Sequence, residues 1–183
     1  EDLGRGNDLN GPGVVIPVLI QAGAFTQAME MIRTLEDVES RIYLNNYLAN
    51  VMAIFGDLDG ALELGSTVDL LPDRFGSSGG ALMAINSALI ERGDAGLALT
   101  FTEKALDRVR SGKVNALFDE EFKFSMQMEI ASEFMRLTRE FDYAGNEELA
   151  LQAMASSLEI ESSLEGNING HDRHYDYFSL EIL

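Results

Sequence analysis

A short motif, Gly-x4-Ala, occurs four times and constrains the fold of this chain more than any other feature of its sequence. The four copies are Gly23 to Ala28, Gly56 to Ala61, Gly93 to Ala98 and Gly145 to Ala150. A Gly that accepts positive φ can end one helix, and a polar residue just after it can cap the next. The Ala then falls in the first turns of the second helix, where a small side chain lets two helices approach closely. The motif therefore predicts four helical hairpins.

The spacing of the four Gly residues indicates a repeat. Successive Gly residues lie 33, 37 and 52 positions apart, and the first two spacings match a period near 34 residues, as expected for stacked helical hairpins. The third spacing is longer, as if the first helix of the last hairpin, about 115–143, had gained extra turns. In this helix Met126, Met128 and Phe134 contribute to a dense apolar patch, which we expect to be mostly core.

Apolar residues at the helical period predict the individual helices. They are expected at 14–21, 25–35, 38–55, 58–71, 81–92, 95–109, 115–143 and 147–158, with a Gly- and Ser-rich hinge at 72–80. The sequence has no alternating β-branched run that would indicate a strand. We therefore expect an all-α fold, and one domain, because 183 residues are enough for a single well-filled core.

The third copy of the motif resembles the tetratricopeptide-type (TPR-like) helical repeat. Hairpins of that family carry a Gly at the turn, an Ala five residues later and a further small residue seven beyond that, and Gly93, Ala98 and Ala105 match this pattern. The resemblance spans about 14–163. It implies a right-handed α-α superhelix (solenoid) of about four helical hairpins with a C-terminal capping segment.

Both ends of the chain lie outside the repeat pattern. We expect a flexible leader at 1–12, a TPR-like repeat domain at 13–163 and an acidic C-terminal cap or tail at 164–183. Aromatic residues of the tail are expected to cover the last hairpin, because the end of a solenoid exposes an apolar face. Since residue 1 is Glu, the chain is expected to be processed or trimmed, and the compartment stays open between cytoplasmic and exported.

The resemblance also implies where a partner would bind. In tetratricopeptide-like solenoids the first helix of each hairpin lines a concave groove. The residues of this chain that would line it are Tyr43, Asn46, Asn50, Met83, Ser87, Arg136 and Arg139. Asn side chains both donate and accept hydrogen bonds, which suits the backbone of an extended peptide. The alternative is that these polar residues are only a solvated inner face.

Composition excludes several classes of function. There are 31 Asp and Glu against 13 Lys and Arg, a formal net charge of -18, which disfavours nucleic acid and anionic membrane surfaces as partners. The absence of Cys excludes a disulfide scaffold, a thiol nucleophile and a thiolate zinc site. The longest apolar run, 14–20, is interrupted by Pro17 and is too short to insert into a membrane.

Chemistry-bearing clusters are sparse. His171 and His174, with Asp172 and Asp176, offer the ligand types for a transition metal, but no third ligand is predicted nearby, so we expect no metal and no cofactor. No Ser lies in a recognisable nucleophile elbow, so we do not expect an enzyme. The sequence favours a non-catalytic module that binds a protein or peptide, with self-association through the solenoid ends as a related expectation. The alternative is a small-ligand or metal-binding accessory protein that uses the groove or the His tail.

Overall fold

The computed structural model describes residues 12–67, 80–111 and 120–168, and these residues form eight helices and no strand. The all-α prediction is confirmed for this part of the chain. The helices are α1 (Pro12–Gln21), α2 (Phe25–Arg33), α3 (Val38–Ile54), α4 (Leu58–Thr67), α5 (Ala81–Glu91), α6 (Ala95–Arg110), α7 (Glu120–Tyr143) and α8 (Glu147–Ile168). The predicted hinge at 72–80 and the His171 and His174 pair lie outside the described residues, apart from Gly80.

The four predicted turns share one backbone geometry. The Gly residues have φ of 73°, 87°, 88° and 72° in chain order, in the region that favours glycine. In each turn the Gly N–H donates to the carbonyl three residues back, and the next N–H donates to the carbonyl five residues before itself, as Asp57 does to Met52. This pair of bonds is the Schellman motif, which satisfies the last carbonyls of the first helix.

The residue after each Gly behaves less uniformly than predicted. Asp57 Oδ1 accepts from the Gly60 N–H at 3.1 Å, and Asn146 Oδ1 accepts from the Leu149 N–H at 3.4 Å, so these two cap the second helix. Asp94 makes no such bond, because its carboxylate accepts from Arg92 Nε at 2.6 Å instead. The motif Ala residues Ala28, Ala61, Ala98 and Ala150 are all buried, as their role at the helix contact requires.

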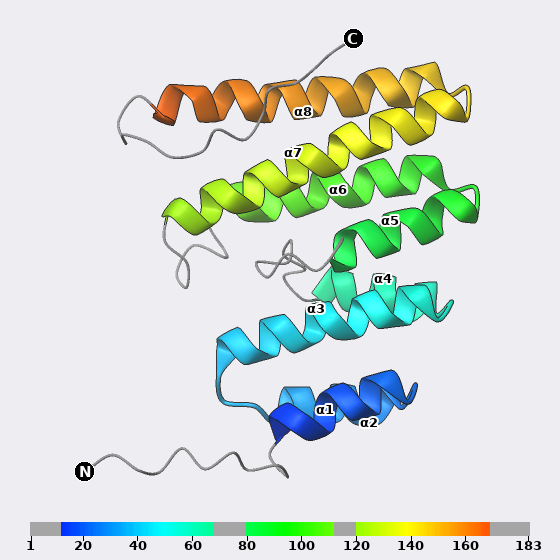
Figure 1. Cartoon of the computed structure of the whole chain (residues 1–183), viewed down its shortest axis with the longest axis vertical. Helices are drawn as coiled ribbons and strands as arrows, with labels where there is room; N and C mark the ends of the chain where they lie inside the picture. Colours follow the sequence, from blue (N-terminus) through cyan, green and yellow to red (C-terminus); the bar gives the residue numbers. More distant parts are fainter. Residues whose placement is uncertain (1–11, 68–79, 112–119, 169–183) are drawn as a thin grey trace.

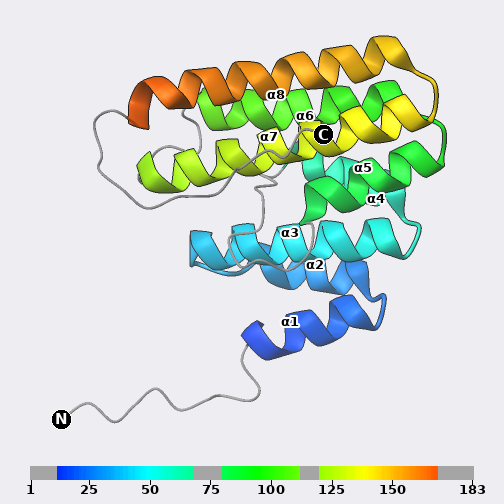
Figure 2. The same cartoon turned by 45° about the horizontal axis from the view of Figure 1, so that its top comes forward.

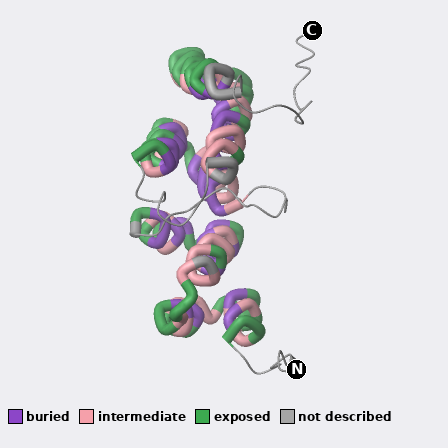
Figure 3. Tube along the Cα trace, turned by 90° about the vertical axis from the view of Figure 1, so that its left-hand side faces the viewer, coloured by how far each residue is buried: buried purple, intermediate pink, exposed green. Residues whose placement is uncertain are grey.

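The helices pair as α1/α2, α3/α4, α5/α6 and α7/α8, and the pairs follow one another along the long axis of the molecule (Figures 1 and 2). Each second helix contacts the first helix of the next pair, as α2 does α3, α4 does α5 and α6 does α7. The hairpins containing α1 and α8 thus form the two ends of the stack. Figure 3 shows the buried stretches on the sides of the helices that face one another.

The last hairpin departs most from the prediction. Helix α8 continues to Ile168, ten residues past its predicted end and beyond the boundary drawn at 163. The reason is its long antiparallel partner: α7 has 24 residues, and Ile160 and Leu164 of α8 stay buried. In the apolar patch of α7, Met126 and Phe134 are buried and Met128 is half-buried, which agrees with a core role. No described helix is long and apolar enough to cross a membrane.

Candidate functional site

The seven residues predicted to line a groove lie on three first helices, α3, α5 and α7. Asn46 and Met83 are ten residues before the Gly of their own hairpin, and Asn50, Ser87 and Arg139 are six residues before it. Because the hairpins repeat the same turn and stack in order, residues at one distance from the turn fall on equivalent faces. Tyr43 and Arg139 are exposed, and the other five are half-buried. The predicted residues therefore occupy the surface of the first helices.

On α3, two amide oxygens lack partners. Asn46 donates through Nδ2 to the carbonyl of Ile42 at 3.1 Å, while its Oδ1 is buried without a hydrogen-bond partner, and Asn50 Oδ1 is in the same condition. Four residues separate the two side chains, so they lie one turn apart on the same side of the helix. A buried acceptor without a donor costs about 1–3 kcal/mol. Helix α3 thus holds two buried acceptors that lack a donor.

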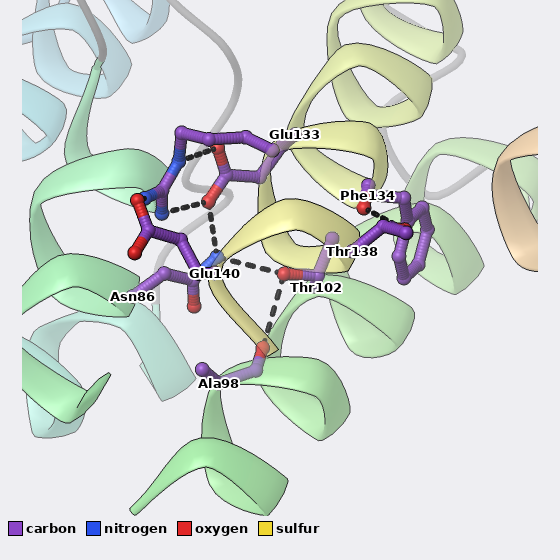
Figure 4. Close-up of polar contacts among 8 residues, drawn as sticks. Asn86, Ala98, Thr102, Glu133, Phe134, Thr138 and Glu140 are labelled. Carbon is purple, nitrogen blue, oxygen red and sulfur yellow. Dashed lines mark hydrogen bonds and ion pairs between the residues drawn. The ribbon is translucent and has the colours of Figure 1, made fainter. Parts of the chain in front are cut away.

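A buried polar cluster joins α5, α6 and α7, and sequence reasoning did not find its centre (Figure 4). Asn86 is fully buried and donates through Nδ2 to Thr102 Oγ1 at 2.8 Å and to Glu133 Oε1 at 2.7 Å. Thr102 in turn donates to the carbonyl of Ala98 at 3.0 Å. Asn86 Oδ1 has no partner. The cluster connects the third hairpin to the fourth.

Arg136 belongs to this cluster rather than to an open face. Its Nε and Nη2 donate to the two carboxylate oxygens of Glu133, each at 2.8 Å, and its Nη1 lies 3.7 Å from Glu140 Oε1. Burial alone would lower the pKa of Arg136, but the hydrogen bonds to Glu133 and the charges of Glu133 and Glu140 raise it above its ordinary value. The guanidinium is therefore held by its own helix and positions Glu133 against Asn86.

The sequence does carry a signal for these missed residues. Asn86 is seven residues before its turn Gly, where the second hairpin has the buried Ala49. Glu133 is twelve residues before its Gly, where the second and third hairpins have the buried Leu44 and Ala81. A polar residue in a core position of the repeat predicts a buried polar contact.

Two hollows lie elsewhere, and none of the seven predicted residues lines either of them. One, of about 430 Å³, lies beside the turns of the second and third hairpins, next to Arg92. Arg92 pairs with Asp94 at 2.6 Å and with Asp59 at 3.1 Å, and hydrogen bonds to those two carboxylates raise its pKa. The other, of about 440 Å³, lies between α2, α3 and α4 and is lined partly by Arg33, Arg41 and Glu63.

The described residues contain no group of three or more His, Asp or Glu side chains arranged to hold a metal ion. Comparison with known proteins adds no assignment, because no family model matches the chain and no curated protein is significantly similar to it. We take the surface of α3 and α5, with the unpaired amide oxygens of Asn46 and Asn50, as the candidate site.

Proposed function

We propose that this chain is a non-catalytic, TPR-like interaction module, a right-handed α-α superhelix of four hairpins that binds an extended peptide or protein segment across the first helices. The fold part of the proposal is supported by the repeated Schellman turn, by the buried Ala of each motif and by the order in which the hairpins contact one another. The binding part rests on α3 and α5.

One observation carries the binding proposal: Asn46 and Asn50 keep unpaired, buried amide oxygens on adjacent turns of α3. Both residues are only half-buried overall, so part of each side chain lies at the surface of α3. Backbone N–H groups of an extended segment supply the missing donors. Binding would then recover the cost that the free protein carries at these two oxygens.

The neighbouring side chains define the chemistry of the partner. Tyr43 and Met83 add apolar surface beside the two amides, and Ser87 adds a hydroxyl at the position in α5 equivalent to Asn50. The net charge of -18 favours approach by a segment that is neutral or basic. Arg139, exposed on α7, is the cationic end of this face. The alternative of a metal-binding accessory protein draws no support from the described residues, since His171 and His174 lie outside them.

The test uses peptides selected from a random library on the immobilised chain, with affinity measured by fluorescence polarisation. The variants Asn46→Ala and Asn50→Ala each remove one acceptor, and each should weaken binding by about 3-fold to 10-fold, the value of one net hydrogen bond.

The matched control is Asn45→Ala, which changes the same residue type on the same helix about 100° around the axis, where Asn45 faces the hollow between α2, α3 and α4. Its affinity should equal that of the unmodified chain. Equal binding by all three variants, or loss only in Asn45→Ala, would refute the assignment of the site to this face.

A further inference from the structure

The outward face of α8, the last described helix, is an apolar stripe. Leu151, Met154 and Leu158 are 61%, 38% and 51% exposed, and their spacing of three and four residues puts them on one side of the helix. They lie six, nine and thirteen residues after the turn Gly145. Large apolar side chains on one continuous helix face are uncommon on the free surface of a monomer.

The same positions are covered in the earlier hairpins. In α6 the residues six, nine and thirteen after Gly93 are Leu99, Thr102 and Leu106, and all three are buried. Helix α6 is followed by α7, which packs on it. In α2 the corresponding Met29 is half-buried and Ile32 is buried. In a hairpin that is followed by another, this face of the second helix is therefore covered by the next hairpin. On α8, the last described helix, the same face is exposed.

The other end of the stack offers the complementary face. Val14 and Val18 of α1, nine and five residues before Gly23, are 45% and 60% exposed. In α3 the equivalent residues are Tyr47 and Val51, half-buried and buried, and the Tyr47 hydroxyl accepts from Gln21 Nε2 of the preceding hairpin at 3.1 Å. On α3 this face therefore meets the preceding hairpin, at Gln21 near the end of α1.

We propose that copies of this chain associate head to tail, with α8 of one copy packed against α1 of the next. The contact would repeat the junctions that α2 makes with α3, α4 with α5 and α6 with α7 inside one chain. This surface is separate from the proposed peptide site on α3 and α5.

The distribution of charge favours α1 as the occupant of the α8 face. Two copies that each carry a net charge of -18 repel one another over most of their surfaces. Helix α1 has no charged residue in its ten positions, which is true of no other described helix. The three side chains of the stripe are apolar as well. Helix α8 carries five Glu and no Lys or Arg, so the uncharged α1 is a surface that brings no further negative charge to this face.

The contact joins two different surfaces, so it is heterologous and does not pair two copies symmetrically. Each added copy leaves one α1 face and one α8 face free, which produces open chains of copies. The experiment is sedimentation velocity on the whole chain from about 10 µM to about 1 mM, the range in which weak contacts form. The average mass should rise steadily with concentration and pass that of a dimer.

Two double variants identify the surfaces. Leu151→Glu/Leu158→Glu blocks the α8 face, Val14→Glu/Val18→Glu blocks the α1 face, and each variant alone should stay monomeric. An equimolar mixture should form a dimer that grows no further, because one free α1 face meets one free α8 face. The control Leu97→Glu changes an exposed Leu of α6 outside both faces and should associate like the unmodified chain.

Each other outcome overturns the proposal. A chain that stays monomeric at every concentration shows that something else covers α8, its own residues 169–183 included. Association of the α1-blocked variant alone indicates a symmetric α8 contact, and a monomeric mixture shows that the two faces do not fit. Circular dichroism checks folding, and the milder Leu151→Gln/Leu158→Gln, which should weaken association at least about tenfold, replaces the Glu variant if that one unfolds.

Discussion

Replacing Glu133 by Gln should destabilise the contact between the third and fourth hairpins by about 2–4 kcal/mol. Glu133 accepts two hydrogen bonds from Arg136 and one from Asn86, all at 2.7–2.8 Å. A hydrogen bond to a charged group contributes roughly 1.5–3 kcal/mol, and removing one partner of a buried ion pair costs about 3–5 kcal/mol. The expected loss of about 2–4 kcal/mol is lower than the cost of breaking a fully buried ion pair. The reason is that the Arg136 side chain is 21% exposed and keeps Glu140 within 3.7 Å.

Urea unfolding followed by far-UV circular dichroism measures this loss as a shift of the midpoint. The matched control is Glu140→Gln, on the same helix and facing the same guanidinium, whose carboxylate is 47% exposed and 3.7 Å away. It should cost no more than about 0.5 kcal/mol. The double variant Glu133→Leu/Arg136→Leu should recover part of the loss, because it leaves no charge unpaired. Equal costs for Glu133→Gln and Glu140→Gln would show that the buried cluster does not stabilise the contact.

Three further predictions concern the turn at Gly93, the amide of Asn50 and the guanidinium of Arg136. Gly93→Ala should cost about 1–2 kcal/mol of stability, because Gly93 has positive φ. Gly96→Ala should be neutral or stabilising, because Gly96 lies within helix α6 with open space around it. Thermal unfolding of the two variants compares these effects. Asn50→Leu removes an unpaired acceptor, so it should leave the free energy of unfolding unchanged or raise it by up to about 1 kcal/mol. It should weaken peptide binding by about 3-fold to 10-fold, as Asn50→Ala does. A marked loss of stability would mean that the amide has a structural role. Because the pKa of Arg136 is raised in the folded protein, its contribution is fully present below its ordinary pKa and is lost only as the pH rises through the higher folded value. The difference in stability between Glu133→Gln and the unmodified chain should therefore be the same at pH 7 and pH 10, and a difference that shrinks over this interval would contradict the assignment.

Features set by local sequence could be predicted, and features set by distant partners could not. The four turns were predictable because positive φ at Gly23 or Gly56 and the small Ala behind it are decided within about six residues. The end of α8 was not, since the polar stretch after Leu158 hides the fact that Ile160 and Leu164 still face the long α7.

The residues of the candidate site also differ in whether local sequence or a distant partner determines their position. The repeat register placed Asn46 and Asn50 on one face of a first helix, because helical spacing alone determines that arrangement. Arg136 was expected to be a side chain of the groove, yet it is held by Glu133, which in turn bonds an Asn 47 residues away. A partner at such a distance along the chain leaves no local pattern, and only the polar residue in a core position of the repeat signals it.

The order in which the hairpins contact one another also determines which hairpin unfolds locally at the lowest free energy. Its contacts run between successive hairpins, so its cooperativity resembles that of a one-dimensional chain of units. The fourth unit is joined to the third through the Asn86 cluster, whereas the first meets α3 through apolar packing and the exposed bond from Gln21 to Tyr47. Amide protons of α1 and α2 should therefore exchange through local opening at lower free energy than those of α7 and α8. A second copy docked on α1 would protect the least stable unit of the stack.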